Sequence, residues 1–327
     1  MITAIEIENL RGIRKGRLEG LAPLTILTGP NGCGKSTVLD ALLIGASLDT
    51  AEAVIRAVQR HPVSLAGADW LFRSSELEAR IWVATDSDQS WEYKLKRSLD
   101  NHKSLKLEAT GWRQAGIFKR TFIAFGVDNK DGSVRTDSTT QAEDLGQFVR
   151  LIDPGIAAPL HETFSNAARA LRKDQVEELL KALVPNFKRL EILTEGDTPF
   201  LAISTETSVA PVSLAGDGIQ ALVQIALEMA AAPGGLVLVE EPEVYQHPGA
   251  IAQTAKAILA NVRRGVQIVL TTHSLELIDA LLSEATEEDV AGMAVFNLLL
   301  RDGELRHGRR VGEQITFARQ NMESDLR

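Results

Sequence analysis

The residues with the most specific chemical pattern lie near the N-terminus. Eight consecutive residues match the spacing G-x-x-x-x-G-K-[ST] in full: Gly29, Pro30, Asn31, Gly32, Cys33, Gly34, Lys35 and Ser36. Thr37 follows them. Glycines at this spacing let backbone N–H groups turn toward phosphate oxygens. The lysine then reaches the β- and γ-phosphates, and the serine hydroxyl ligates Mg²⁺. The spacing therefore predicts a P-loop that binds ATP together with Mg²⁺.

The neighbours of this loop suit the same chemistry. An apolar strand, Leu24 to Leu27, precedes it, and an apolar helix from Ser36 to Ala46 follows. The helix aims the positive end of its dipole at the bound anion. A glycine-rich turn without a ligand is the weaker interpretation. Cys33 leaves two interpretations open, a redox-sensitive thiol at a helix N-terminus or a small tolerated side chain, and we favour the second.

A second candidate group is acidic. Glu240 and Glu241 come directly after the apolar strand 236–239. A buried strand has little use for two acids at its tip unless a positive group meets them. Mg²⁺ held through Glu240, with Glu241 polarising the attacking water, meets that need. A strand that ends at an acidic surface loop is the alternative, and the P-loop upstream favours function.

The next apolar strand, 266–270, continues into Thr271-Thr272-His273-Ser274. Neighbouring strands of a parallel sheet end at the same edge, where ligands bind. We therefore expect His273 beside the acidic pair, with its ring able to contact a γ-phosphate. A histidine that only makes structural hydrogen bonds is the alternative. The other two parts of a nucleotide site favour the functional interpretation.

A third group precedes a helix that extends to about Ala231. It consists of small and polar residues: Ser213, Leu214, Ala215, Gly216, Asp217 and Gly218. Small residues before a helix N-terminus can form an anion-binding surface. A capped helix start has the same appearance, so this pattern is weak by itself.

The elements that must position these residues predict an α/β fold. Residues 2–7 indicate a first strand. From 218 to 280 the pattern runs helix, apolar strand, helix, apolar strand, helix, which is typical of a parallel sheet covered by helices. We expect one P-loop domain over 1–327, with its core formed by 1–50 and 205–327.

The middle of the chain, 51–204, is expected to be an insertion. Residues 76–126 alternate polar and apolar side chains between turn residues, which predicts an antiparallel β-meander with one wet face. Helical spacing over 159–184 predicts a helical lid, and 188–212 indicate a pair of strands.

Bulk composition excludes several classes of protein. Hydrophobic residues make up 44% of the 327 residues and charged residues 24%, the balance of a globular protein. No apolar run approaches the ~20 residues that span a bilayer, so we expect no membrane insertion. One cysteine excludes an internal disulfide, and the cytoplasm is the expected compartment. The net charge of −9 argues against a polycation that coats DNA.

Together, in this order, these elements resemble ABC-type ATPases, in the non-transporter clade of SMC, RecF and OLD-like proteins. The opening Ile5 to Ile13 is similar to that clade's first strand and turn, which implies that Arg11 reaches the nucleotide. Residues 240–248, EEPEVYQHP, resemble the OLD-like acidic motif, and 271–274 resemble its switch-histidine motif.

The resemblance also implies an assembly. The segment 213–218 takes the place of the signature motif, which in the family contacts the γ-phosphate of ATP held by the other subunit. Two ATP molecules are then shared in a head-to-tail homodimer. Glu240 stands where the family has Asp, and Gly216 where it often has Ser, so slow hydrolysis is expected. Gln114 is one candidate for the family's Q-loop glutamine. Only 54 residues follow His273, fewer than an OLD-type nuclease domain of about a hundred residues needs.

Three functions follow as hypotheses. The leading one is a stand-alone ATPase switch that dimerises on ATP and controls an effector protein, in antiphage defence or DNA maintenance. The second is the ATP-binding subunit of a membrane transporter, against which the OLD-like motif and the meander count. The third is an ATP-gated scaffold that binds nucleic acid through basic residues: Arg14, Lys15, Arg17, Arg169, Arg172 and Lys173. Solvated charge is the favoured interpretation of those residues.

Overall fold

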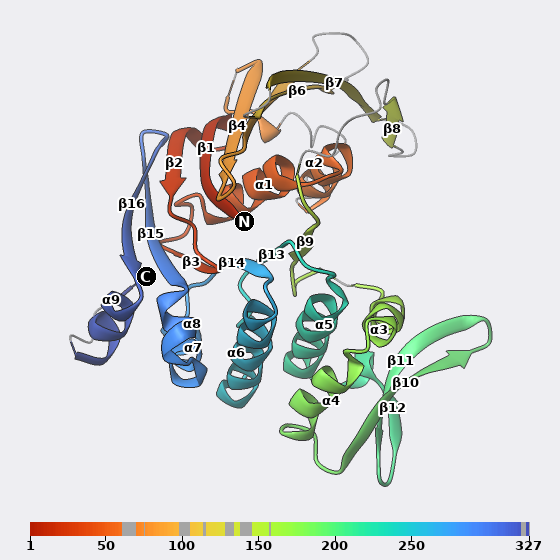
Figure 1. Cartoon of the computed structure of the whole chain (residues 1–327). Coiled ribbons are helices and arrows are strands. Elements are labelled where there is room, and N and C mark those ends of the chain that lie inside the picture. Colours follow the sequence, from red (N-terminus) through yellow and green to blue (C-terminus); the bar gives the residue numbers. More distant parts are fainter. Residues whose placement is uncertain are drawn as a thin grey trace. The chain divides into compact units, whose positions relative to one another are not determined.

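The computed structural model describes residues 1–60, 70–74, 76–97, 105–113, 116–127, 134–137, 146–156, 158–321 and 325–326. Figure 1 shows the helices and strands of the chain, coloured along the sequence. Contacts divide the chain into two compact units. Unit 1 comprises Met1–Val149 and Phe296–Arg309. Unit 2 comprises Arg150–Val295 and Arg310–Arg327. The predicted mixture of strands and helices, an α/β fold, is confirmed in both.

Unit 1 is built on a mixed sheet with the strand order β8-β7-β6-β5-β4-β1-β2-β16-β15-β3. The strands are β1 (Ile2–Leu10), β2 (Ile13–Glu19), β3 (Leu24–Thr28), β4 (Glu78–Thr85), β5 (Ser90–Arg97), β6 (Leu105–Arg113), β7 (Gly116–Val127), β8 (Val134–Asp137), and most of β15 (Met293–Arg301) and β16 (Glu304–Val311). Strands β4 to β7 pair antiparallel in sequence order, so the predicted meander is confirmed. Buried Ile81 and Val83 alternate with more exposed residues along β4, which gives the expected wet face.

Helix α1 (Lys35–Ala46) is the centre of this unit. All of its residues except Ser36 are buried, as expected for a helix that is apolar all round. Its close approach to β4 depends on Gly45, where a Cβ atom would lie 2.7 Å from the Ile81 side chain. The Trp91 indole donates a hydrogen bond to the Gly45 carbonyl at 2.6 Å and fixes the same contact from β5. A second helix, α2 (Thr50–Gln59), packs beside α1.

Unit 2 contains the parallel part of the fold. Strands β13 (Leu236–Val239) and β14 (Gln267–Thr271) pair parallel, and β9 (Val149–Ile152) lies on the other side of β13. Every residue of β13 and β14 is buried, as expected for strands covered on both faces. The accompanying helices are α5 (Asp217–Ala231), α6 (Pro248–Arg263), α7 (Leu275–Glu284), α8 (Glu287–Ala291) and α9 (Glu313–Thr316), followed by a π-helical turn, Phe317–Asn321.

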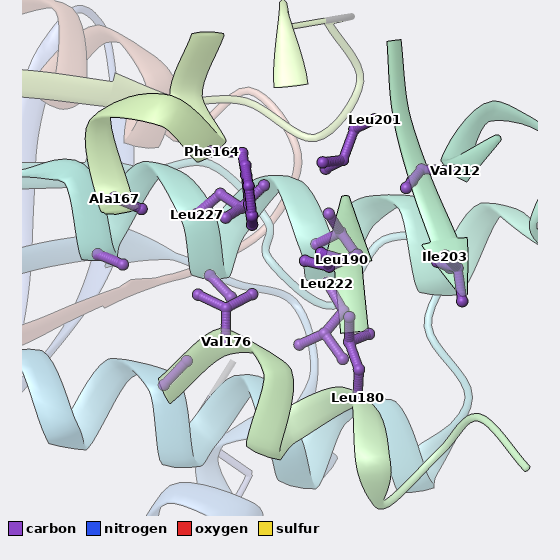
Figure 2. Packing of buried hydrophobic residues seen from close by; sticks show 14 residues of the cluster. Phe164, Ala167, Val176, Leu180, Leu190, Leu201, Ile203, Val212, Leu222 and Leu227 are labelled. Atoms are coloured by element: carbon purple, nitrogen blue, oxygen red, sulfur yellow. The ribbon is translucent and has the colours of Figure 1, made fainter. Parts of the chain in front are cut away.

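A smaller antiparallel sheet belongs to the same unit. Its strands are β10 (Phe187–Glu195), β11 (Thr198–Thr205) and β12 (Val209–Pro211), and helices α3 (Leu160–Arg169) and α4 (Lys173–Lys181) precede it. Figure 2 shows Phe164 of α3, Val176 of α4 and Leu190 of β10 converging on Leu222 and Leu227 of α5. One hydrophobic cluster therefore joins the predicted lid to α5.

The predicted helices over 159–184 and the alternation over 218–280 are confirmed. Residues 188–212 form strands as predicted, but three of them instead of a pair, because the short β12 adds to the edge of β11. The division into a core of 1–50 and 205–327 with an insertion of 51–204 stays a prediction. Among the described residues, no helix combines the length and the apolar character needed to cross a membrane.

Candidate nucleotide site

The predicted P-loop connects β3 to α1 in unit 1. Gly29, Gly32 and Gly34 have positive φ angles of 131°, 75° and 99°, a backbone region that favours glycine. A Cβ atom at Gly29 would lie 2.4 Å from the Leu298 carbonyl oxygen, so no larger residue fits there. The Cys33 N–H donates to the Pro30 carbonyl at 3.2 Å and closes the turn. The loop thus has the geometry that its spacing predicts.

The Lys35 side chain is folded into this loop. Its Nζ donates to the carbonyl oxygens of Gly29 at 3.0 Å and Pro30 at 3.4 Å, and the residue is only 6% exposed. A buried ammonium needs such acceptors, because burial without them is costly. The lysine that we expect to meet the phosphates is therefore held at the loop itself. Ser36 and Thr37 follow it in the first turn of α1.

Cys33 is the fifth residue of the loop motif and is 3% exposed. Burial raises the pKa of its thiol, and the charge of Lys35 opposes that shift without reversing it. A thiol with a raised pKa is a poor nucleophile at neutral pH. Its environment supports the interpretation of Cys33 as a small packed side chain.

Arg11 lies in the turn between β1 and β2, with a φ of 49°. Its Nη2 donates to the Ala57 carbonyl at 2.8 Å and lies 3.0 Å from Asp40 Oδ2. Asp40 is fully buried in α1 and also binds Arg60 at 2.6 Å. Burial is the main cause that lowers the Arg11 pKa, although Asp40 opposes the shift. These bonds tie the turn to α1 and α2, and the contact of Arg11 with a nucleotide stays a prediction.

In unit 2, the acidic pair lies at the end of β13. The Glu240 N–H donates to the Ile152 carbonyl of β9 at 2.9 Å. The Glu241 N–H donates to both the carbonyl and the hydroxyl of Thr271, each at 3.1 Å. Glu241 has a φ of 40°, a conformation that costs a non-glycine residue about 1–3 kcal/mol. Such strain at the tip of a buried strand is common where a side chain is aimed at a ligand.

His273 follows β14 and meets Glu241. Its Nε2 lies 3.5 Å from Glu241 Oε1, and the two side chains are 34% and 38% exposed. The structure therefore brings together the two residues that parallel pairing of β13 and β14 predicts as neighbours. Both remain accessible to a ligand.

Sequence reasoning missed a carboxylate that organises this edge. Glu243 Oε1 accepts hydrogen bonds from Thr272 Oγ1 at 2.6 Å and from the His273 N–H at 3.0 Å. Glu243 belongs to the EEPE run of the acidic motif, but the motif by itself assigned it no role. Its partners follow β14, 29 and 30 positions along the chain.

The candidate signature segment forms a 3₁₀ turn, Val212–Leu214, and the start of α5. Leu214 is 77% exposed. Gln220 steadies the segment, because its Nε2 donates to the Ala215 carbonyl at 2.7 Å and to the Ser213 carbonyl at 3.3 Å. This bracing glutamine had no recognisable sequence signal.

The two glycines of that segment have different surroundings. A Cβ atom at Gly216 would meet nothing within 4 Å. At Gly218 it would lie 2.8 Å from the Tyr245 carbonyl oxygen, in the loop that follows the acidic pair. Only Gly216 therefore has room for a larger side chain.

The predicted residues are thus distributed over both units. The P-loop and Arg11 belong to unit 1, whereas the acidic pair, His273 and the signature segment belong to unit 2. Gln114, the Q-loop candidate, lies outside the described residues.

The described residues bear on how a magnesium ion could be bound. Within the described part of the chain, no three His, Cys, Asp or Glu residues gather to hold a metal by themselves. Mg²⁺ in ATPases needs no such cage, because it binds one or two protein oxygens together with the phosphates. The Ser36 hydroxyl in unit 1 and the Glu240 carboxylate in unit 2 are each an oxygen donor of that kind, and their joint binding of one Mg²⁺ stays a prediction.

Comparison with known proteins adds independent information. Residues 24–279 match the family described as AAA domain, putative AbiEii toxin, Type IV TA system. An uncharacterised protein of Methanocaldococcus jannaschii is 34% identical over 34% of this chain and 98% of its own length. An ATP/GTP phosphatase of Helicobacter pylori is 20% identical over 99% of both chains.

Among solved structures, an SMC head bound to the C-winged helix domain of ScpA has the same fold. It superimposes with a TM-score of 0.59 at 14% identity, over 96% of this chain and 99% of that one. The predicted ABC-ATPase head fold is confirmed by this likeness.

Proposed function

We propose that this chain, a member of the AAA-domain family of the putative AbiEii toxin type and an ABC-type ATPase, is a switch. It closes on ATP and controls a partner. The observation that carries the proposal is the contact of Glu241 with His273 at the ends of adjacent parallel strands. About a third of each of these two side chains is exposed. The chain also carries the glycine-rich loop 29–36, whose three glycines have positive φ angles.

In the proposed mechanism, the loop N–H groups and Lys35 hold the triphosphate, and Lys35 exchanges its carbonyl partners for phosphate oxygens. Ser36 and Glu240 would hold Mg²⁺, which would neutralise charge on the phosphates. Glu241 orients the attacking water and accepts its proton. His273, held beside Glu241, contacts the γ-phosphate. Glu240 reaches farther than an aspartate in this position, so we expect slow turnover.

We further propose that ATP joins two copies of the chain head to tail. The signature segment of one copy then contacts the γ-phosphate bound by the other. Its exposure supports this arrangement, because Leu214 is 77% exposed and Tyr245, in the loop beside Gly218, is 63% exposed. A single continuous domain over 1–327, with 51–204 as its insertion, is part of the same proposal.

The partner is an effector protein in the cytoplasm, and the setting is antiphage defence or DNA maintenance. The similar SMC head binds a protein domain, that of ScpA, which makes a protein partner the natural expectation here. Family analogy alone supports the biological setting.

The two alternatives are weaker. For a nucleic-acid scaffold, the candidate basic residues are already engaged: Arg14 binds Glu304 at 2.6 Å and Arg17 binds Glu6 at 2.9 Å. Arg172 donates to the backbone carbonyls of Ala230 and Ala232. For a transporter subunit, a membrane partner is needed, and cell fractionation would show it.

Glu241→Gln tests the proposed mechanism. The amide cannot accept the proton of the water, so ATP should still bind while phosphate release falls about 10²-fold or more. Calorimetry measures the affinity and a phosphate-release assay measures turnover. Glu195→Gln, at an exposed residue of β10, is the matched control and should leave both unchanged. Hydrolysis within about threefold of the parent would refute the role of Glu241.

A further inference from the structure

We propose that Glu243 is a positioning residue for ATP hydrolysis: its carboxylate holds the segment Thr272–His273 in register with Glu241. This inference rests on the proposed function and assigns a role to a residue that touches no nucleotide in the mechanism above.

The first connection runs from Glu243 to the segment after β14. A single carboxylate oxygen, Oε1, accepts from the hydroxyl of Thr272 and from the backbone N–H of His273. Hydrogen bonds to an ionised acceptor are roughly twice as strong as neutral ones. The His273 backbone is therefore fixed by a bond to the acidic loop.

The hydroxyl of Thr272 connects Glu243 to the next residues of the turn. Thr272 is fully buried, donates to Glu243 and accepts from the Ser274 N–H at 2.9 Å. Ser274 in turn caps α7, since its Oγ accepts from the Leu277 N–H at 3.2 Å. One carboxylate thus orders the whole turn between β14 and α7.

A second connection runs in the opposite direction. The Glu241 N–H donates twice to Thr271, so each loop is bonded to the other. Between these two connections lies the 3.5 Å contact of Glu241 Oε1 with His273 Nε2. Both side chains of that contact are partly exposed. The bonds between the two loops fix the backbone on either side of the contact.

Four variants test this role. Glu243→Ala removes both bonds, whereas Glu243→Gln keeps an acceptor oxygen without the charge. Thr272→Val removes the hydroxyl at nearly constant volume, and Thr272→Ser keeps it. We expect kcat to fall at least about tenfold in Glu243→Ala and Thr272→Val, and clearly less in Glu243→Gln and Thr272→Ser. The Kd for ATP should stay within about twofold, because the P-loop is untouched.

A double-mutant cycle separates positioning from general damage. If Glu243 acts through His273, Glu243→Ala should cause no further loss of kcat in a His273→Ala background. Equal fold-losses in both backgrounds would overturn the inference. Thermal unfolding of each variant verifies that the fold is retained. The two Thr272 variants test the same hydrogen bond by changing its donor instead of its acceptor.

A measurement without nucleotide makes the test independent of catalysis. Hydrogen exchange of the His273 amide reports its bond to Glu243 directly. We expect faster exchange in Glu243→Ala than in the parent, with the amides of β13 unchanged. Unchanged exchange at His273 would refute the inference. A parent protein that fails to hydrolyse ATP would instead refute the proposed function, while exchange would still decide the role of Glu243.

Discussion

At the scale of single residues, charge placement at the P-loop governs what the site can bind. Lys35 brings the only formal charge of the eight-residue loop motif, and its neighbours in that motif are neutral. Replacing it removes charge-assisted hydrogen bonds worth about 1.5–3 kcal/mol each. The loop backbone, which is shaped by its glycines, should survive the change.

Lys35→Ala should therefore weaken ATP binding at least about tenfold without unfolding the protein. Titration calorimetry measures the affinity, and thermal unfolding reports the fold. Lys15→Ala, at an exposed lysine of the same unit, is the matched control and should bind ATP like the parent. Equal affinity in Lys35→Ala would show that the loop is not the phosphate site.

The raised pKa of Cys33 makes a separate prediction. Burial keeps this thiol protonated at pH 7, and only the thiolate reacts with alkylating agents. Iodoacetamide should modify Cys33 more slowly than a cysteine placed at the exposed turn residue Ser87. Mass spectrometry of the Ser87→Cys protein compares both sites in one sample. Faster modification of Cys33 would favour the redox-sensitive interpretation.

Single residues could be predicted from the sequence only where a motif fixes their spacing. The loop glycines, Glu241 and His273 belong to such motifs. Glu243 belongs to the acidic motif, but its bonds to Thr272 and His273 in another loop cannot be predicted from that motif. Gln220 donates to carbonyls five and seven residues upstream, a contact that no spacing rule predicts. Arg11 illustrates the same limit, because its partners Asp40 and Ala57 become visible only when helices pack.

At the scale of elements, the short helix α8 depends on its polar ends more than on packing. Thr286 and Asp289 form a capping box, and Asp289 also receives a bidentate bond from Arg263 of α6. The hydrogen bond from Arg263 is the main cause that lowers the pKa of Asp289. A carboxyl group with a lowered folded-state pKa stabilises the fold above its unfolded-state pKa, and this stability is lost as pH falls.

Asp289→Asn should therefore destabilise the protein by about 1 kcal/mol at pH 7, the usual magnitude of a cap. The difference from the parent should shrink as pH falls below about 4, because the unfolded aspartate is protonated there and the folded one follows at lower pH. Urea unfolding at pH 7 and pH 3 measures it. Glu288→Gln, at an exposed residue of the same helix, is the control. A difference that grows toward low pH would contradict the assignment.

The order and type of elements followed from periodicity, because helices and strands impose different spacings on apolar residues. The packing of the lid against α5 did not follow from periodicity. Leu180, Leu190 and Leu201 are unremarkable apolar residues of two helices and a hairpin, yet they share one cluster with α5 (Figure 2). Such long-range contacts follow from shape complementarity, which is absent from local spacing.

At the scale of the whole molecule, the proposed shared sites can be tested by mixing variants. The chosen signature change is Gly216→Glu, because this position has open space, whereas Gly218 adjoins the Tyr245 carbonyl of its own chain. The new carboxylate should repel the phosphates of the partner copy and leave the acidic loop intact.

Lys35→Ala and Gly216→Glu should each be inactive alone, and mixing them should restore hydrolysis. In a mixed dimer, one shared site carries both defects and the other carries neither. Gly308→Glu, at a second glycine with open surroundings, is the control and should stay active by itself. If every site were built within one chain, mixing would restore nothing, and the head-to-tail arrangement would be wrong.

The bonds of Lys35 to the carbonyls of Gly29 and Pro30 have a consequence for the reaction cycle. If Lys35 binds ATP as proposed, phosphate oxygens replace these carbonyl oxygens around its ammonium group. We then expect the ammonium to hold the loop in its curved conformation after product leaves, so the next triphosphate meets a loop that needs no rearrangement.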